Sequence, residues 1–381
     1  MDNNIKESPK TRFAYIDNVR SLVIILVITM HSAVTYSGIG DWYYKEGSLE
    51  NLSVFGMVFF AFLQSFLQAW IMGLLFFISA FLATKSLAKR TSLGFIKERL
   101  FRLGLPLLIY VFIISPFVYF ILLGIQPENT FIENYLQFIN SFWWLSSTGP
   151  LWFVQVLLLF CIVYTIVKKL VPKPIKINET TTANIISIIL LIGVVAFFVR
   201  IKFPMGTNFL NLQFSYFTSY IVMFVSGILI GENDLLEKIT DAKNLKWLKW
   251  TLIIGVPLWV ATLIVGGALE GKEYFNGGFY WQSFAFALWE SLTAIGFSIG
   301  LLAFFKNKAN WDNKFTRVMR DNGFGIYFFH APILISVSLI LKHLVLNPIF
   351  KFLMVTILAS IISLIFSFLV RKIKPVGVLL K

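Results

Sequence analysis

Three ionisable side chains interrupt an apolar, helix-forming stretch near the start of the chain. Asp17, Arg20 and His31 lie within residues 15–37, whose other members are mostly apolar. Arg20 and His31 are eleven residues apart, just over three helical turns, so both side chains fall on one face of a helix. At about 1.5 Å per residue, His31 lies roughly 16 Å further along the axis. If Arg20 is at the edge of a membrane, His31 is near its middle, where an ionisable group marks a candidate functional site.

Two further ionisable residues are expected at the same depth. His330 and Glu290 each lie well inside a long apolar segment. Together with His31 they can supply a general base, an acid that orients it and a helper for proton transfer. The same three residues also suit a structural Glu–His hydrogen bond, a proton path or a metal site. Because the histidines lack the spacing of metal ligands and no cysteine partners them, we expect no metal.

Two pairs of charged residues lie near the predicted edge of the membrane. Asp17 and Arg20 are one turn apart, so an ion pair between them would lower the cost of placing both there. Arg99 and Arg102 are also three residues apart and present two guanidinium groups to one side of a helix. Such a pair suits bidentate contacts with phosphate oxygens. Anionic lipid, or the general preference of basic residues for the cytoplasmic side, explains these arginines as well.

A third candidate group is aromatic. Residues 142–153 read FWWLSSTGPLWF and contain Trp143, Trp144 and Trp152. Tryptophans beside polar residues and glycine can stack on sugar rings, so we include them as candidate substrate-binding residues. The alternative is a belt of aromatic side chains at the membrane–water interface.

The composition indicates what surrounds these residues. Hydrophobic residues make up 57% of the 381 residues and charged residues 14%, and the mean hydropathy is +0.78. These proportions exceed those of soluble globular domains and predict an all-α, polytopic membrane protein. The net charge of +14 is carried by the predicted loops. We therefore expect membrane lipid, and not nucleic acid, as the partner of this charge.

Ten apolar segments are near or above the length that spans a bilayer, about 20 residues. They cover roughly residues 19–37, 52–84, 106–124, 151–167, 184–199, 215–231, 250–266, 280–305, 322–341 and 348–370. With ten spans, 27 of the 33 Lys and Arg residues fall on the side of the two termini and 6 on the other. Basic residues stay on the cytoplasmic side, so both termini are predicted to be cytoplasmic.

Two segments carry more specific expectations. The 34 residues 51–84 would form a helix of about 51 Å, so they must tilt, kink or begin as an interfacial segment. The basic, amphipathic stretch that follows is expected to be an interfacial helix that ends at Pro106. No repeat or low-complexity tract divides the chain, so residues 1–381 are expected to form a single domain.

Several of these stretches, taken in order, resemble the type 3 membrane acyltransferases. They are YIDNVRSLVIILVITMHS, with a basic residue, ten intervening positions and a histidine; ERLFRLGLP, with Arg-x-x-Arg; LLFFISAFLA; GPLWFVQ; FVSGILIG; and GIYFFHAP. The resemblance covers almost the whole chain, and in size the chain is similar to the branch that includes the glucan biosynthesis protein C succinyltransferases. Ala80 stands where many relatives have glycine.

The resemblance implies an enzyme that transfers an acyl group from a cytoplasmic acyl-CoA, such as acetyl-CoA or succinyl-CoA, to a hydroxyl of an envelope or secreted glycan. It implies His31 as the catalytic residue, either a general base or itself acylated. Arg20 and Asp17 would lie at the donor entrance, Glu290 and His330 would support the histidine, and Arg99 and Arg102 would hold the donor's phosphates. No permanently bound cofactor is expected.

The family also implies a multi-pass protein of a bacterial cytoplasmic membrane that modifies polysaccharide, for example by O-acetylation. The residues alone leave a second class of protein open. Ten spans with Glu and His near the midplane also suit a proton-coupled transporter of a polar solute. A transporter does not need Arg-x-x-Arg beside the first span, whereas the enzyme needs it to bind the donor.

Overall fold

Ten membrane-length helices form the protein, as the sequence predicts. The computed structural model describes residues 13–380, and within them the chain is helical apart from loops and one isolated bridge between Phe209 and Leu212. The ten helices long and apolar enough to span a membrane are α1 (Ala14–Ser37), α2 (Val54–Leu87), α3 to η4 (Ser92–Leu122), η6 with α6 (Gly149–Leu170), α7 (Thr182–Lys202), η7 with α8 (Phe214–Glu232), η8 with α10 (Ala242–Val265), α11 to α12 (Trp281–Lys308), α13 (Lys314–Ile340) and α14 (Pro348–Val370). Shorter helices are α5 (Phe131–Asn140), α9 (Leu236–Ile239) and α15 (Lys374–Leu379). The chain is therefore a multi-pass membrane protein.

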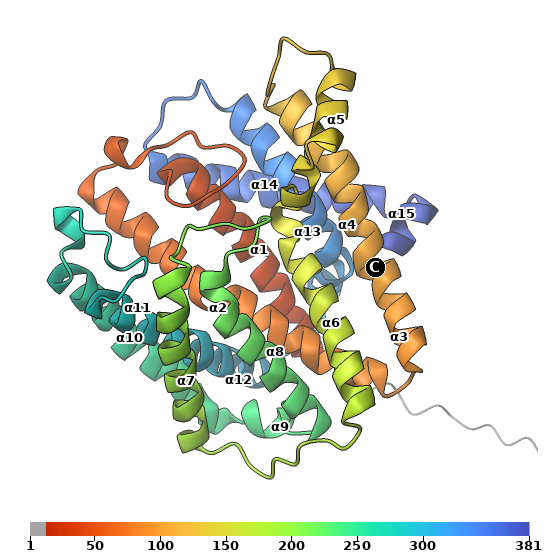
Figure 1. Ribbon diagram of the computed structural model, residues 1–381, viewed down its shortest axis with the longest axis vertical. Coiled ribbons are helices and arrows are strands. Elements are labelled where there is room, and N and C mark those ends of the chain that lie inside the picture. The colour runs from red at the N-terminus through yellow and green to blue at the C-terminus, as the bar shows by residue number, and fades with distance from the viewer. Residues whose placement is uncertain (1–12, 381) are drawn as a thin grey trace, which may run out of the picture.

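The first helix lies among several others and is not at the edge of the bundle. α1 packs against α2, α12, α13 and α14 (Figure 1). Its apolar side chains Val19, Val23 and Ile28 are fully buried in these contacts. Helices at the periphery instead expose large apolar side chains, among them Phe198 on α7 and Ile365 on α14. Such residues suit a surface that faces lipid, so the site-bearing helix is shielded from lipid by its neighbours.

Contacts between helix ends divide the molecule into two sides. The end of α2 meets the α8–α9 turn through an ion pair between Lys85 and Asp234, and Lys168 at the end of α6 lies 2.9 Å from Glu232. Asn307 near the end of α12 donates to the Thr240 carbonyl at 2.9 Å. We call this the basic side, because the described parts of the segments predicted to be cytoplasmic gather there. Lys6, Lys10, Arg12 and Lys381 lie outside the described residues.

The second helix is a single uninterrupted helix. α2 has 34 residues and begins at an N-cap, where the Ser53 hydroxyl accepts from the Gly56 N–H. Figure 1 shows it crossing the bundle obliquely relative to α6 and α7. Of the three possibilities that its length allowed, the structure thus has a tilted helix relative to its neighbours.

The expectation of a separate helix ending at Pro106 is wrong. Residues Ser92–Leu122 form one continuous helical run. It widens into π-helical turns at Leu100–Gly104, Tyr110–Ile114 and Phe117–Leu122, on either side of Pro106 and Pro116. A proline lacks the N–H of the usual helical bond and clashes with the preceding turn, and a π-turn shifts the hydrogen bonds enough to accommodate both effects. Arg99 and Arg102 therefore lie on the first turns of the third membrane-length helix.

Candidate functional site

The two intramembrane histidines meet. His31 on α1 and His330 on α13 lie with their ring centroids 5.4 Å apart and their planes within 18°. The meeting follows from the packing of α1 against α13. His330 is fully buried, whereas His31 keeps part of its surface exposed. The structure thus brings two of the three expected residues together, and His31 is the more exposed member of the pair.

The hydrogen bonding of His330 indicates which ring nitrogen carries its proton. Nδ1 lies 2.5 Å from the carbonyl oxygen of Tyr327, one turn earlier in α13. A carbonyl only accepts, so Nδ1 must donate and Nε2 holds a lone pair. That Nε2 is buried and has no hydrogen-bond partner among residues 13–380. Tyr327 is itself held by a hydrogen bond from its hydroxyl to the Pro150 carbonyl. The structure therefore holds a proton acceptor beside His31.

A tryptophan that sequence reasoning missed covers His31. Trp42 stacks on the imidazole with ring centroids 3.8 Å apart and an interplanar angle of 13°. Its ring centroid is 6.2 Å from that of His330. Trp42 belongs to the loop that follows α1, residues 38–53. A signal existed in the sequence GIGDWYY, where two glycines turn the chain directly after the helix and are followed by aromatic residues.

The 38–53 loop is fixed over the end of α1 by several contacts. Gly38 ends the helix in the left-handed conformation, with φ of 73°, and its N–H donates to the Val34 carbonyl. Further along, the N–H groups of Glu46 and Gly47 both donate to the Thr35 carbonyl, at 2.8 and 3.0 Å. A side chain at Gly47 would overlap the backbone of α1, so only glycine allows this approach. The loop therefore returns to the helix that it leaves.

A buried ion pair anchors the same loop to α14. The Glu46 carboxylate pairs with Lys351, whose ammonium also donates to the Lys342 carbonyl at 3.2 Å. The Lys351 residue is 3% exposed. A buried charge requires such a partner, because removing it from water is otherwise strongly unfavourable. The loop that places Trp42 on His31 is thus connected to a helix far away in the sequence.

An aromatic path runs from this loop towards the aromatic segment that was singled out in the sequence. Tyr43 lies at hydrogen-bond distance from Ser115, with 3.4 Å between the two hydroxyl oxygens, and its ring is 5.4 Å from that of Tyr119. Trp143 stacks on Tyr119 at 4.8 Å. Burial raises the pKa of Tyr43, so its hydroxyl stays protonated and acts as a donor. Trp143 is thereby linked to Trp42, ring by ring.

The other two tryptophans lie elsewhere. Trp144 packs against Phe112, with ring centroids 5.5 Å apart. Trp152 packs at 5.5 Å against Tyr220 on α8. Of the three tryptophans that were predicted to bind substrate, the structure joins only Trp143 to the surroundings of His31.

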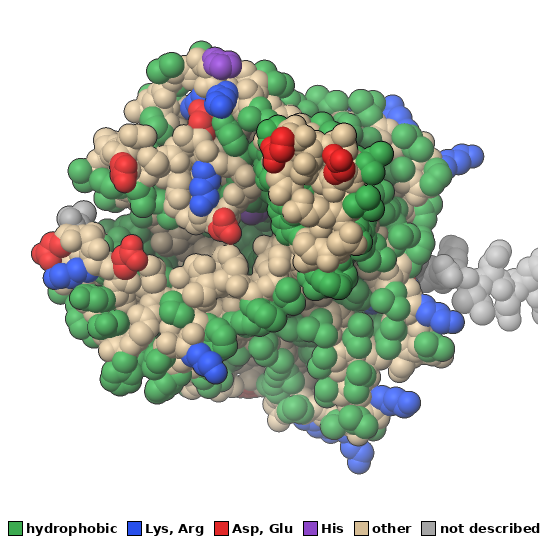
Figure 2. Space-filling view, turned by 45° about the horizontal axis from the view of Figure 1, so that its top comes forward, with side chains coloured by type: hydrophobic (Ala, Val, Ile, Leu, Met, Phe, Trp, Pro, Cys, Tyr) green, Lys and Arg blue, Asp and Glu red, His purple; other side chains and the backbone are tan. Residues whose placement is uncertain are grey.

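Figure 2 shows a face of the molecule that is hollowed near its centre, and part of a histidine side chain is visible within the hollow. Polar and backbone atoms form much of its rim, and few charged side chains are seen inside it. His31 has some exposed surface whereas His330 has none, so His31 is the imidazole of the pair that is open to its surroundings. The arrangement can present an imidazole nitrogen to a substrate that enters from the side opposite the basic side.

The predicted pair of Asp17 and Arg20 is present at the other end of α1. Arg20 Nη1 lies 3.6 Å from Asp17 Oδ1, and the Arg20 side chain is 45% exposed. Asn18, between them, donates to the carbonyls of Ala309 at 3.0 Å and Trp311 at 2.9 Å. These bonds tie the basic end of α1 to the α12–α13 connection. Arg20 is therefore an accessible cation on the helix that carries His31.

The two arginines of the third helix share one carboxylate. Glu98 lies 3.5 Å from Arg99 Nε and 2.8 Å from Arg102 Nε. The Arg99 side chain is 19% exposed and lies over the Phe95 ring at 4.8 Å, whereas the Arg102 side chain is 52% exposed. The three residues together carry one net positive charge. Arg102 is the member that a bound anion can reach most readily.

Glu290 does not join the histidines, and its interpretation as the acid that orients His31 is wrong. It forms a buried ion pair with Arg200 at the end of α7. Arg200 is fully buried, donates from Nε to the Ser215 carbonyl at 3.2 Å and lies over the Tyr216 ring. Arg200 is one of the six basic residues that the sequence placed on the side opposite the termini. A buried carboxylate takes the nearest cation, and the packing of α7 against α11 supplies one.

Metal ligation has no candidate in the part of the chain that the structure describes. Among residues 13–380, no group of three or more His, Cys, Asp and Glu side chains could hold a metal ion.

Comparison with known proteins gives one match. A family model described as an acyltransferase domain matches residues 13–372, which is nearly the whole chain. No curated protein and no solved structure gives a significant match.

Proposed function

Since the chain belongs to the family that this acyltransferase-domain model describes, we propose that it transfers an acyl group from acyl-CoA on the basic side of the membrane to a hydroxyl group of a glycan on the other side. It is a membrane acyltransferase; the donor, the acceptor and the residues that act on them are the proposal. The observation that carries it is a partly exposed His31, which Trp42 covers on one face and which lies beside a fully buried His330.

The proposed chemistry at His31 takes one of two routes. As a general base, its free nitrogen removes the proton of an acceptor hydroxyl while the hydroxyl oxygen attacks the thioester carbonyl, and the CoA thiolate leaves and takes up a proton. As a nucleophile, the same nitrogen attacks the thioester carbonyl, the CoA thiolate leaves, and an acyl-imidazole forms. The acceptor hydroxyl then attacks this acyl-imidazole, which releases the imidazole and a proton. In either route the Nε2 lone pair of His330 is available to share the proton. The packing of Trp42 and Tyr327 around the rings supports a fixed orientation.

The proposed donor is acetyl-CoA, succinyl-CoA or a similar acyl-CoA. Its phosphates would be held by Arg102 and Arg99, and Arg20 with Asp17 would line the way to His31. The roughly 16 Å rise from Arg20 to His31 along α1 is a distance that the extended arm of coenzyme A can bridge. Support comes from the exposure of Arg102 and Arg20 and from their common location on the basic side.

The proposed acceptor is a sugar of an envelope or extracellular glycan. The path of rings from Trp143 through Tyr119 and Tyr43 to Trp42 offers apolar faces and hydroxyl donors, which suit a sugar ring. We further propose that the basic side, with both termini, is cytoplasmic, that the membrane is a bacterial cytoplasmic membrane, and that residues 1–381 act as one domain.

The test uses purified protein in vesicles with labelled acyl-CoA supplied on one side and a glycan acceptor on the other. We expect label to appear on the glycan, and only when acyl-CoA is present on the side of Arg102. Transfer of intact labelled solute without acylation would contradict the proposal and favour a carrier. Absence of both activities with every acyl-CoA from acetyl to succinyl, in protein that is monodisperse, would also contradict it.

A further inference from the structure

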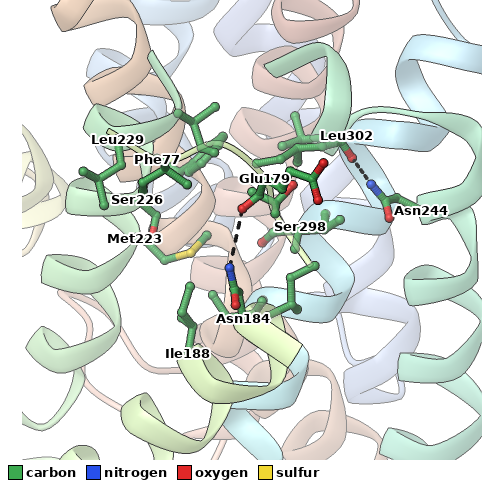
Figure 3. Close-up of a pocket in the computed structure, with 17 residues that line it drawn as sticks. Phe77, Glu179, Asn184, Ile188, Met223, Ser226, Leu229, Asn244, Ser298 and Leu302 are labelled. Carbon is green, nitrogen blue, oxygen red and sulfur yellow. Dashed lines mark hydrogen bonds between the residues drawn. The ribbon is translucent and has the colours of Figure 1, made fainter. Parts of the chain in front are cut away.

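A cavity of about 130 Å³ lies between α2, α7, α8 and α12 towards the basic side. This is many times the roughly 10–15 Å³ that a single water molecule requires. Its described lining includes no residue of α1 or α13, so it is separate from the two histidines. Figure 3 shows Met223 and Ser226 on one side of this space and Leu302 on the other, with Ser298 between them.

The wall of the cavity is mostly apolar, and one of its polar side chains is an unpaired, buried hydroxyl. Ser298 is 1% exposed, and its Oγ has no hydrogen-bond partner among the described residues. Serine hydroxyls in helices commonly bond to the carbonyl one turn earlier, and leaving a buried hydroxyl unpaired costs about 1–3 kcal/mol. A ligand that carries an acceptor oxygen at this depth would supply the missing bond. The cavity therefore has the features of a binding site and not only of a packing gap.

The mouth of the cavity is polar and is crossed by the linker between α6 and α7. Ile177 and Glu179 of this linker line the cavity. Asn233 holds the linker by accepting from the Ile177 N–H at 3.1 Å and donating to the Ile175 carbonyl at 2.9 Å. The Lys238 ammonium donates to the Asn178 carbonyl at 2.9 Å, next to Glu179. The mouth on the basic side is thus flanked by a positively charged group, Lys238, and a carboxylate, Glu179.

The surroundings identify the kind of molecule that can enter. α7, which forms one wall, exposes Leu190 and Leu191 on its outer surface, where lipid is the neighbour. The cavity offers an apolar space and a buried hydroxyl, and an ammonium group lies beside its mouth. A glycerophospholipid carries groups that correspond to these: an acyl chain, ester oxygens and a phosphate. We propose that the cavity binds one acyl chain of a glycerophospholipid from the leaflet on the basic side, with an ester oxygen at Ser298 and the phosphate at Lys238.

The proposal is tested with the full chain in phosphatidylethanolamine and phosphatidylglycerol vesicles that contain a phospholipid with a photoreactive acyl chain. Illumination is expected to label the cavity, with Met223 and Ile188 among the modified residues. Ser226→Phe points a large ring into the cavity and should reduce this labelling at least fivefold. The matched control is Val225→Phe, one residue away, where the side chain is 45% exposed on the outer surface of α8; it should leave labelling unchanged.

Two further measurements keep the result unambiguous. Native mass spectrometry of the detergent-purified protein should show one retained phospholipid, lost in Ser226→Phe and weakened in Ser298→Ala and Lys238→Gln. Ser226→Leu serves if the phenylalanine variant is not monodisperse. Equal labelling of the cavity and of outward residues such as Phe198, unaffected by either Ser226 variant, would overturn the proposal. Displacement of the label by a polyprenyl phosphate but not by phospholipids would overturn the choice of ligand.

Discussion

His31 is the one described intramembrane imidazole that combines partial exposure with a fixed orientation. Trp42 covers one of its faces, and His330 lies close and nearly parallel. An aromatic ring of the kind seen at Trp42 restricts an imidazole without neutralising its nitrogen. His330, with its proton on Nδ1, contributes a lone pair and no charge. At the scale of the residue, the proposed chemistry moves one proton at His31, and the lone pair of His330 lies beside that ring.

Substitution of the two histidines should separate their roles. We expect His31→Ala to lower kcat for acyl transfer by about 10²–10⁴-fold, the usual contribution of a general base. His330→Gln should give a smaller loss in kcat with little change in either KM, because His330 does not reach the substrate. Steady-state kinetics on monodisperse protein measures both. Turnover of His31→Ala within threefold of the natural protein would refute the assignment.

The two arginines of the third helix are expected to differ. Arg102→Ala should raise the KM for acyl-CoA about tenfold or more, since a charge-assisted hydrogen bond contributes about 1.5–3 kcal/mol. The matched control is Arg90→Ala, an exposed arginine that bonds within its own helix end. It removes the same charge on the same side and should leave this KM unchanged. Equal effects of the two variants would point to general electrostatic attraction and against a phosphate contact.

Among the elements, the 38–53 loop is the one that places Trp42 on the His31 ring. It is attached to α1 through the Thr35 carbonyl and to α14 through Lys351 and Glu46. The loop therefore couples the position of Trp42 to a helix that is distant in the sequence. Glu46 and Lys351 are positioning residues, because they act on His31 only through the loop.

Removing one partner of this buried pair should impair catalysis. In Lys351→Met the Glu46 carboxylate loses its buried partner, which typically costs about 3–5 kcal/mol. We expect a loss in kcat of tenfold or more and an unchanged KM for acyl-CoA. The double variant Glu46→Gln with Lys351→Met should regain part of kcat.

Lys45→Met is the matched control in the same loop. The ion pair of Lys45 with Asp41 is 3.9 Å long and exposed, so it contributes little. If Lys45→Met and Lys351→Met reduced kcat equally, the anchoring role of the buried pair would be disproved.

A second buried pair connects α7 with α11 and serves stability. Glu290→Gln leaves the fully buried Arg200 without its carboxylate, so the melting temperature should fall markedly. The double variant Arg200→Met with Glu290→Leu should restore much of it, because well-packed apolar residues often replace a buried pair without loss. For each variant, kcat per folded molecule should stay within about twofold. A loss in kcat like that of His31→Ala, without a change in melting temperature, would contradict this structural role and support a role for Glu290 in catalysis.

At the scale of the whole molecule, ten helices divide the chain's polar groups between two sides. The basic side brings together the ends of α2, α6, α8 and α12, whereas the opposite side carries the 38–53 loop and the hollow. His31 lies between them on a helix shielded from lipid. In the proposed function, a donor and an acceptor approach one imidazole from these two sides.

Labelling of introduced cysteines checks the orientation. In a Cys161→Ser background, Lys89→Cys and Lys342→Cys place a thiol on opposite sides, both at exposed positions. With intact cells and a membrane-impermeant maleimide, we expect only Lys342→Cys to react, and both after permeabilisation. Labelling of Lys89→Cys in intact cells would reverse the predicted orientation, and with it the direction of acyl transfer.

Patterns that depend on local composition were predicted well. The number of spans follows from hydropathy, and the pair of Asp17 and Arg20 follows from their spacing of one turn. These properties depend on residues that are near each other in the chain. The helical run through Pro106 escaped the same reasoning, because π-turns depend on hydrogen bonds that neighbouring helices help to stabilise.

Partners from distant segments were decided only by the tertiary structure. Sequence alone identified His31 and named His330 and Glu290 as candidates to support it. Judged by depth in the membrane, these two are equally plausible as partners of His31. The packing of α1 against α13 places His330 beside His31. The packing of α7 against α11 places Glu290 in an ion pair with Arg200. The contact of Trp42 with His31 became apparent only from the fold of the 38–53 loop. Hydropathy fixes how deep a side chain lies in the membrane, whereas the neighbours at that depth depend on how the helices are arranged around one another.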